Sequence, residues 1–176
     1  MLAGGPRSGI VYQMDLSTLA MTPVLDEPGY GIWQAHFSPD GRWMTFNAIK
    51  DNRSIVYVAP FRKAVVPRNE WIPITDGQAD DKPYFSSDGK LIIFTSDRDG
   101  FHCIWAQRLS SENRALNSPF AVYHFHQRRG ALANLGKDGL EIDVGPGIIV
   151  FNRAELSGNV WLLEPAKGKA DAAQTR

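Results

Sequence analysis

Two histidines, His124 and His126, are separated by a single residue in the stretch VYHFHQRR. On a β-strand, residues two apart point to the same face, so both imidazoles would lie on one side of a sheet. Such a pair could bind zinc or copper, but a closed site needs four ligands and the nearby sequence offers no third. We interpret the two histidines as an exposed or edge-strand pair, and we predict no metal site and no cofactor.

Four aspartates near two turns, Asp80, Asp81, Asp97 and Asp99, have the type and spacing closest to calcium-loop chemistry. Oxygen ligands spaced along a turn can surround a hard cation. The run SDRDG lacks the longer ligand series and the closing bidentate glutamate of such loops. We therefore favour turn formation and hydrogen bonds to Arg98 and similar residues as the role of these carboxylates.

Three serines, Ser38, Ser86 and Ser87, are the candidate nucleophiles, and they occupy related turn regions. No G-x-S-x-G elbow is present, and a catalytic triad would also need a placed histidine and acid. No P-loop or G-x-G-x-x-G motif occurs, and the GPG at 145–147 is typical of a turn. We predict that the chain is not an enzyme, and that any catalysis would lie in a domain outside it.

The charge balance excludes two classes of binding protein. The chain has 19 basic and 19 acidic residues, whereas nucleic-acid binders and polybasic membrane-surface elements concentrate positive charge. The single cysteine, Cys103, can form neither an internal disulfide nor a thiolate metal site. The sequence has no run of 18 apolar residues and no signal peptide, so we predict no membrane insertion by this segment. Periplasm and cytoplasm both remain open as the compartment.

An internal repeat organises the chain. Residues 37–41 have the sequence FSPDG and residues 85–89 have FSSDG, 48 positions later. Tyr57 aligns with Trp105 at the same offset, and Trp161 is the matching residue of a degenerate last copy. Several anchors that share one period indicate a repeat architecture. We expect Trp105 and Trp161, which occupy a repeated strand position, to pack between repeats.

Each repeat consists of short segments rich in β-branched and aromatic residues and bounded by Gly, Asp, Asn or Ser, as strands are. The dipeptides Asp40-Gly41 and Asp88-Gly89 favour hairpin turns, because glycine tolerates positive φ and aspartate can bond its own backbone. No window has convincing helical periodicity. We expect strands near 10–16, 20–25, 32–37, 42–48, 54–60, 70–75, 82–86, 90–96, 102–109, 119–125, 131–135, 147–152 and 158–163.

Four-stranded antiparallel sheets repeated every 45–57 residues are typical of β-propeller blades. We predict an all-β fold, a partial β-propeller of about three and a half four-stranded antiparallel blades. Propellers close with about four to eight blades, so either an N-terminal part or further copies would complete the ring. The predicted units are a partial blade with its last two strands (1–28), a blade (29–77), a blade (78–127), a degenerate terminal blade (128–165) and a disordered tail (166–176).

The phrases FSPDGRWMTF and FSSDGKLIIFTSDRDGFHCIW resemble the PD-type, WD40-like propeller repeat (PD40) of TolB and of prolyl-oligopeptidase propellers. The match is close in residues 35–58 and 82–109 and loose in 7–25 and 147–163. The resemblance implies the C-terminal, TolB-like propeller portion of a larger bacterial protein. It is specific for fold and uninformative for function, because such propellers serve unrelated roles.

Four residues are candidates for contact with a partner: Trp33, His36, Trp71 and His102. In a propeller the first strand of a blade borders the central channel, so His36 could line a pore site. Trp33 and Trp71 fall at strand starts near loops, and tryptophan is favoured at interface hot spots. His102 is an isolated histidine near a turn. For each of them we favour packing or another structural role inside the sheets over contact with a partner.

Three functions are compatible with these features. The first is a non-catalytic module for protein or peptide binding or scaffolding, the sensor part of a kinase or a winged-helix regulator. The second is the propeller of a prolyl-oligopeptidase-like hydrolase, whose hydrolase domain normally follows the propeller, whereas this sequence ends in a polar tail. The third is a TolB-type periplasmic component of envelope transport. We favour the first, because loops on rigid sheets are the usual place for recognition.

Overall fold

The computed structural model describes residues 2–4, 9–77, 79–126, 130–155, 157–159 and 161–163. In this part of the chain, consecutive strands of the same sheet pair in antiparallel fashion. Four sheets result. The first contains β1 (Leu2–Gly4), β2 (Ile10–Met14) and β3 (Met21–Asp26), and the second contains β4 (Gly31–Phe37), β5 (Trp43–Lys50), β6 (Arg53–Pro60) and β7 (Ile72–Pro73). The third contains β8 (Asp81–Phe85), β9 (Leu91–Ser96), β10 (Cys103–Leu109) and β11 (Ala115–Tyr123), and the last contains β12 (Ile142–Gly145) and β13 (Ile148–Phe151).

The helices among the described residues are short connectors. They are the 3₁₀ helices η1 (Arg68–Glu70) and η3 (Leu132–Leu135) and the single turn α1 (Gly136–Gly139). Within the described ranges, no helix has the length and apolar character needed to cross a membrane.

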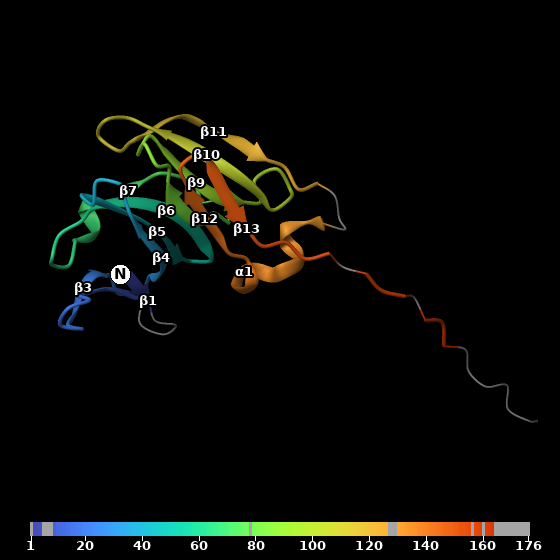
Figure 1. Ribbon diagram of the computed structural model, residues 1–176, viewed down its shortest axis with the longest axis horizontal. Helices are drawn as coiled ribbons and strands as arrows, with labels where there is room; N and C mark the ends of the chain where they lie inside the picture. The colour runs from blue at the N-terminus through green and yellow to red at the C-terminus, as the bar shows by residue number, and fades with distance from the viewer. Residues whose placement is uncertain are drawn as a thin grey trace, which may run out of the picture.

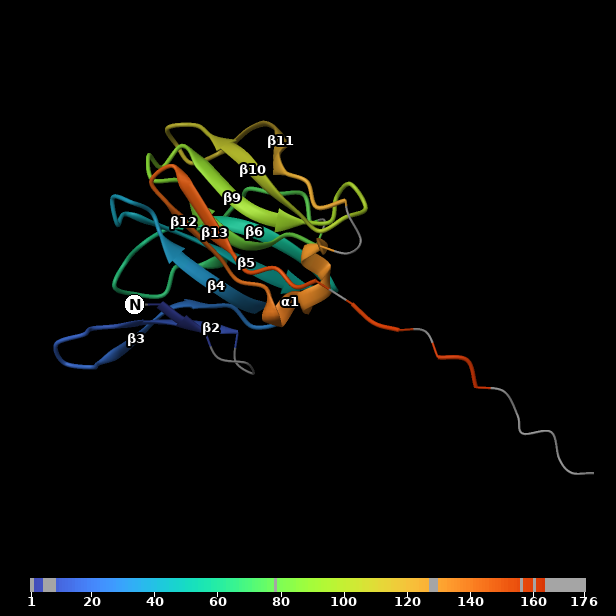
Figure 2. The same cartoon turned by 45° about the vertical axis from the view of Figure 1, so that its right-hand side comes forward.

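The first strands of successive sheets lie next to one another. β4 contacts both β1 and β8, and β8 also contacts β12 (Figures 1 and 2). We call β4, β8 and β12 the inner strands. In Figure 1 the sheets follow one another in chain order, from blue β1–β3 through β4–β7 to yellow-green β8–β11. This is the arrangement of propeller blades, and it confirms the predicted all-β class and partial propeller.

Hydrophobic cores occupy the spaces between successive sheets. Val24, Met44 and Phe46 belong to the first core, between sheets one and two, and each is fully buried. Val58 and Phe94 belong to the second core, between sheets two and three. A third core joins the third sheet to the η3, α1 and β12 region; its buried members are Ile93, Cys103, Ile104, Ala106, Phe125, Leu132, Leu140 and Ile142. Each sheet is therefore stabilised by its neighbours, as expected for repeats that cannot bury both faces alone.

The repeated turn has the predicted structural role. The Ser38 hydroxyl donates to Asp40 Oδ1 at 2.6 Å and accepts from the Trp43 amide at 2.9 Å. Gly41 and Gly89 have φ of 69° and 70°, the left-handed conformation that glycine adopts without strain. The side-chain hydrogen bond from Ser38 and bonds from Arg42 lower the pKa of the Asp40 carboxyl to about 2.

The two ends of the described chain differ from the strand predictions. The first sheet has three strands, because Leu2–Gly4 pairs with β2 where two strands were expected. The region 131–135 is mostly the helix η3, whose Leu132 is fully buried in the third core. β12 forms in a stretch where no strand was expected, and it pairs with β13 through Gly145 opposite Ile148.

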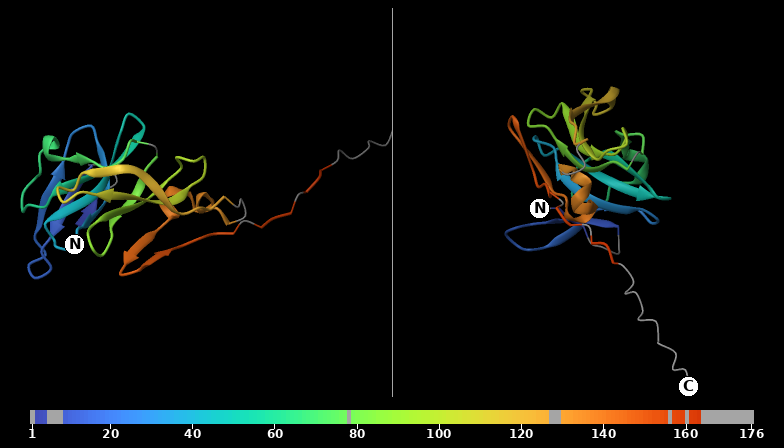
Figure 3. Two further views of the ribbon diagram at one scale, coloured as in Figure 1. Left: turned by 90° about the horizontal axis from the view of Figure 1, so that it is seen from above. Right: turned by 90° about the vertical axis from the view of Figure 1, so that its right-hand side faces the viewer.

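The predicted last strand near 158–163 is also wrong for the residues described. Residues 157–159 and 161–163 have no strand pairing and extend away from the sheets in every view (Figures 1, 2 and 3). Trp161 is 88% exposed, so it does not pack between repeats as expected. The predicted tail, 166–176, lies outside the described residues.

Candidate binding site

The inner strands β4 and β8 carry the same backbone irregularity. Gln34 and Lys82, 48 positions apart, have φ of 54° and 52°, and each lies where the pairing register of its strand shifts. Such β-bulges bend a strand and re-aim its side chains. The Lys82 amide donates to Gln34 Oε1 at 2.8 Å, so the two bulges are joined directly.

An aromatic pair next to these bulges links two sheets. The rings of His36 and Tyr84, which are repeat equivalents, are stacked with centroids 3.8 Å apart. Burial lowers the pKa of His36 to about 4, although the carboxylates of Asp143 and Glu141 act in the opposite direction. Burial, with the same two carboxylates, raises the pKa of Tyr84 to about 12. At neutral pH both rings are therefore uncharged.

A hollow of about 360 Å³ opens beside the bulges. Trp33 forms an aromatic wall, and Asn47, Asp81, Lys82 and Asp138 contribute polar groups. Asn47 is 1% exposed, and its Nδ2 donates to Asp81 Oδ1 at 2.9 Å. Its carbonyl oxygen, Oδ1, accepts no hydrogen bond within the described part of the chain. Buried polar atoms are normally paired, so this acceptor is an exception among the described residues.

The lysine of this hollow is almost completely buried. The Lys82 side chain is 7% exposed, and its Nζ lies 3.3 Å from Oε1 of Glu141, which is 71% exposed. A buried ammonium group needs a partner of opposite charge. Glu141 supplies it from the segment that leads into β12. The hollow itself is lined by the second and third sheets and by Asp138 of α1.

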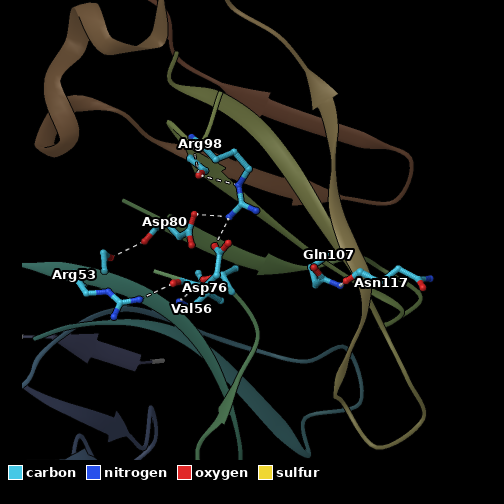
Figure 4. A network of polar contacts seen from close by, with 10 residues as sticks. Arg53, Val56, Asp76, Asp80, Arg98, Gln107 and Asn117 are labelled. Carbon is cyan, nitrogen blue, oxygen red and sulfur yellow. Dashed lines mark hydrogen bonds and ion pairs between the residues drawn. The ribbon is translucent and has the colours of Figure 1, made fainter. Parts of the chain in front are cut away.

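A polar network below the hollow fixes the second sheet against the third (Figure 4). Arg98 Nη2 lies 2.8 Å from Oδ1 of Asp80, a fully buried carboxylate, and 3.4 Å from Oδ1 of Asp76. Arg53 Nη2 donates to the Asp76 carbonyl at 2.8 Å (Figure 4). Burial raises the pKa of Asp80, while hydrogen bonds including that from Arg98 oppose the rise. The hydrogen bonds to Arg98 expected from the sequence are present.

The structure separates the four predicted interaction residues. Trp33 lines the hollow and His36 lies beside it on the same inner strand. Trp71 is 4% exposed in the first core, where its Nε1 donates to the Val66 carbonyl at 3.2 Å. Burial therefore corrects the place of Trp71 among the candidate contact residues and gives it the packing role that the sequence favoured. His102 lines a different hollow, beside η3.

A second cluster, absent from the sequence predictions, gathers around the paired histidines. Nδ1 of His124 and Nε2 of His126 each lie 2.9 Å from Oδ2 of Asp99. The ligand atoms of these three residues and of the buried Cys103 all lie within 4.8 Å of one another. The two histidines follow the end of β11. The fold brings Asp99 and Cys103 to them from an earlier part of the sequence.

The charge states of this cluster follow from its surroundings. Burial acts to raise the pKa of Asp99, but hydrogen bonds from His126 and the Phe101 amide hold it below its usual value. Burial raises the pKa of the Cys103 thiol. A sequence signal was present: the expected strands 102–109 and 119–125 are hairpin neighbours, and their pairing places Ile104 opposite Tyr123.

Comparisons with known proteins agree with the fold. The sequence matches no protein-family model and no curated protein. TolB from Acinetobacter baumannii is similar with a TM-score of 0.58 and 23% identity, over 86% of this chain and 36% of that one. A puromycin-hydrolyzing peptidase from Mycobacterium tuberculosis is similar with a TM-score of 0.54 and 12% identity, over 69% and 22%. The chain thus spans about a third of TolB and about a fifth of the peptidase. It has the fold of a portion of a TolB-like β-propeller.

Proposed function

We propose that this chain is a non-catalytic β-propeller module that binds a protein or peptide segment in the hollow beside Trp33. The observation that carries the proposal is the hollow itself, which is lined by Trp33 and by polar residues that include the exposed Asp138. A backbone amide or a lysine or arginine side chain of a partner would pair with the Asp138 carboxylate. Trp33 offers the flat apolar surface that hot-spot residues commonly provide.

The charges in the hollow favour a donor-rich segment. Among the described lining residues, the Lys82 ammonium group already faces Glu141, and the Asp81 carboxylate is buried and accepts from Asn47. The carboxylate of Asp138 is exposed at the hollow and can attract positive charge. An extended segment with exposed amides and a basic side chain fits this chemistry best.

The experiment is selection of displayed random peptides on the immobilised chain, followed by affinity measurements with the selected peptides. We expect Trp33→Ala to weaken their binding by about tenfold or more, since hot-spot aromatics dominate small interfaces. Tyr123→Ala is the matched control, because Tyr123 is an aromatic residue, 59% exposed, on a different sheet. Peptides that bind equally to the parent and to Trp33→Ala, or no enrichment at all, would contradict the proposal.

The wider role concerns the larger protein to which such a module would belong. We propose that the module is the sensor or interaction part of a larger bacterial protein of the kinase or winged-helix type. The similarity to a peptidase keeps the propeller of a prolyl-oligopeptidase-like hydrolase as the second candidate, beside a TolB-type periplasmic component. Coding sequence adjacent to this chain distinguishes them, since a kinase, a DNA-binding or a hydrolase domain would each be evident there.

A further inference from the structure

We propose that Asp99, Cys103, His124 and His126 form a zinc site that ties the β9–β10 turn to the segment leaving β11. This inference is independent of the peptide-binding proposal, because the hollow beside Trp33 is built by other residues. It also goes against the sequence-based expectation of no metal site, since the fold supplies the ligands that the local sequence lacked.

The geometry of the four side chains is close to that of a zinc site. Both imidazole nitrogens lie 2.9 Å from the same Asp99 oxygen, and the rings of His124 and His126 have centroids 4.5 Å apart. All four ligand atoms lie within 4.8 Å of one another. Ligands placed tetrahedrally around zinc, at about 2.0–2.3 Å from it, stand roughly 3.3–3.7 Å apart. Small side-chain rotations would therefore open the cluster to receive the ion.

The donor set selects the metal. Two imidazoles, a thiol and a carboxylate are the groups that zinc takes in tetrahedral sites. Calcium and magnesium prefer all-oxygen ligands, so the sulfur and nitrogen donors argue against them. Four protein ligands leave no open position for a substrate, so the site is structural in type.

Neighbouring backbone groups support the ligands. The Phe125 amide donates to Cys103 Sγ at 3.2 Å, and an N–H donor at sulfur stabilises a metal-bound thiolate. Phe125 lies between the two histidines, so one short segment presents both imidazoles and this donor. The Phe101 amide donates to Oδ1 of Asp99 at 3.2 Å, which leaves Oδ2 directed at the histidines. This outer layer orients the set as second-shell groups do in metal sites.

The location explains what the ion would stabilise. Asp99 lies within the β9–β10 turn and Cys103 begins β10, whereas the histidines begin the connection from the third sheet to η3 and β12. Side chains of Cys103 and Phe125 are buried in the third core. A bound ion would hold the connection to the terminal hairpin in place, and binding to the folded chain alone would raise its stability.

The test is a titration of the metal-free 176-residue chain with zinc in competition with a chromogenic chelator. We expect one zinc per chain, a melting temperature that rises with zinc and falls again with EDTA, and weakening by about tenfold or more in Asp99→Asn, His124→Gln and His126→Gln. The histidine side chains are 46% and 48% exposed, so these variants retain the buried core. With cobalt in place of zinc, a thiolate-to-metal charge-transfer band should appear in the parent and be lost in Cys103→Ala.

Two matched controls come from the same turn. Asp97→Asn and His102→Gln replace a carboxylate and an imidazole outside the cluster, and they should bind zinc as tightly as the parent. The proposal is overturned if the folded parent binds no zinc, or if the ligand variants and the controls bind it equally well. A cobalt spectrum without the thiolate band would remove Cys103 from the site and overturn the four-ligand assignment.

Discussion

Ser86 illustrates how a repeated residue serves structure rather than chemistry. Its hydroxyl donates to Asp88 Oδ1 at 2.6 Å and accepts from the Leu91 amide at 3.0 Å, as Ser38 does one repeat earlier. The bond from Ser86 and one from the Lys90 amide lower the pKa of the Asp88 carboxyl. The Ser86 hydroxyl thus holds both the Asp88 carboxylate and the Leu91 amide, the first amide of β9.

Replacing this hydroxyl should destabilise the turn. We expect Ser86→Ala to lower the free energy of unfolding by about 1–2 kcal/mol, because the Leu91 amide loses its side-chain acceptor. Ser87→Ala, one residue further on and exposed, should change it by less than about 0.5 kcal/mol. Urea denaturation midpoints measure both. Equal effects of the two substitutions would show that the Ser86 bonds contribute nothing specific.

The role of a residue could be predicted where the residue recurs in the repeat. It could not be predicted where the role depends on tertiary packing. The structural role of Asp40 and Asp88 follows from their recurrence in FSPDG and FSSDG. The neighbours of His124 could not be identified from local spacing, because Asp99 lies 25 residues away in sequence and reaches it through strand pairing. Trp71 fails as a surface anchor for the same reason, since burial in the first core depends on the neighbouring sheet.

Elements with runs of β-branched and aromatic residues were predicted well, and those without such runs were missed. The strands of the two central sheets have runs such as LIIFTS, which becomes β9. β12 has the sequence IDVG, which is too short and too rich in turn residues to be recognised alone, and it forms because β13 and β8 provide a place for it. The region of η3 was expected as a strand because it is apolar, and an apolar run alone does not distinguish a strand from a buried helical turn.

The junction between the second and third sheets depends on a buried ion pair. The Arg98 side chain is 12% exposed and the Asp80 side chain is fully buried. We expect Arg98→Gln to lower the free energy of unfolding by about 3 kcal/mol, because a buried carboxylate loses its cation. Arg114→Gln is the control, since Arg114 is 68% exposed and its pairing with Glu112 contributes at most about 1 kcal/mol.

A double variant separates the ion pair from simple loss of packing. Asp80→Asn combined with Arg98→Gln removes both charges. The double variant should therefore lose less unfolding free energy than the sum of the losses in the two single variants. Thermal or urea unfolding of the four proteins provides the cycle. Additive costs would mean that the two side chains act independently and that the junction does not rely on their pairing.

At the scale of the whole molecule, the sheets meet along the inner strands, and polar groups such as those of Asp81 and Lys82 are buried there beside the aromatic rings. His36 of β4 stacks on Tyr84 of β8, and Asp143 of β12 acts on both. Three sheets therefore converge on a histidine that the fold keeps neutral. Protonation of the His36 ring therefore affects the packing between sheets rather than a single strand.

This arrangement predicts an acid sensitivity with a defined sign. The pKa of His36 is lowered from an ordinary 6.5 to about 4 by burial, while Asp143 and Glu141 oppose and Lys82 adds to the shift. Between these values the unfolded chain binds more protons than the folded one, so stability should fall as the pH drops from about 6.5 to 4. The full loss attributable to His36 should be about 2–3 kcal/mol.

His36→Tyr isolates this contribution, because tyrosine is what the next repeat carries at the equivalent position, Tyr84. Unfolding free energies of parent and variant should differ in their pH dependence only between about pH 6.5 and 4, with the variant losing less. A difference between parent and His36→Tyr that stays constant from pH 7 to 4 would mean that His36 titrates normally. Water would then reach His36 between the inner strands, and the interpretation that His36 is buried between the sheets would be wrong.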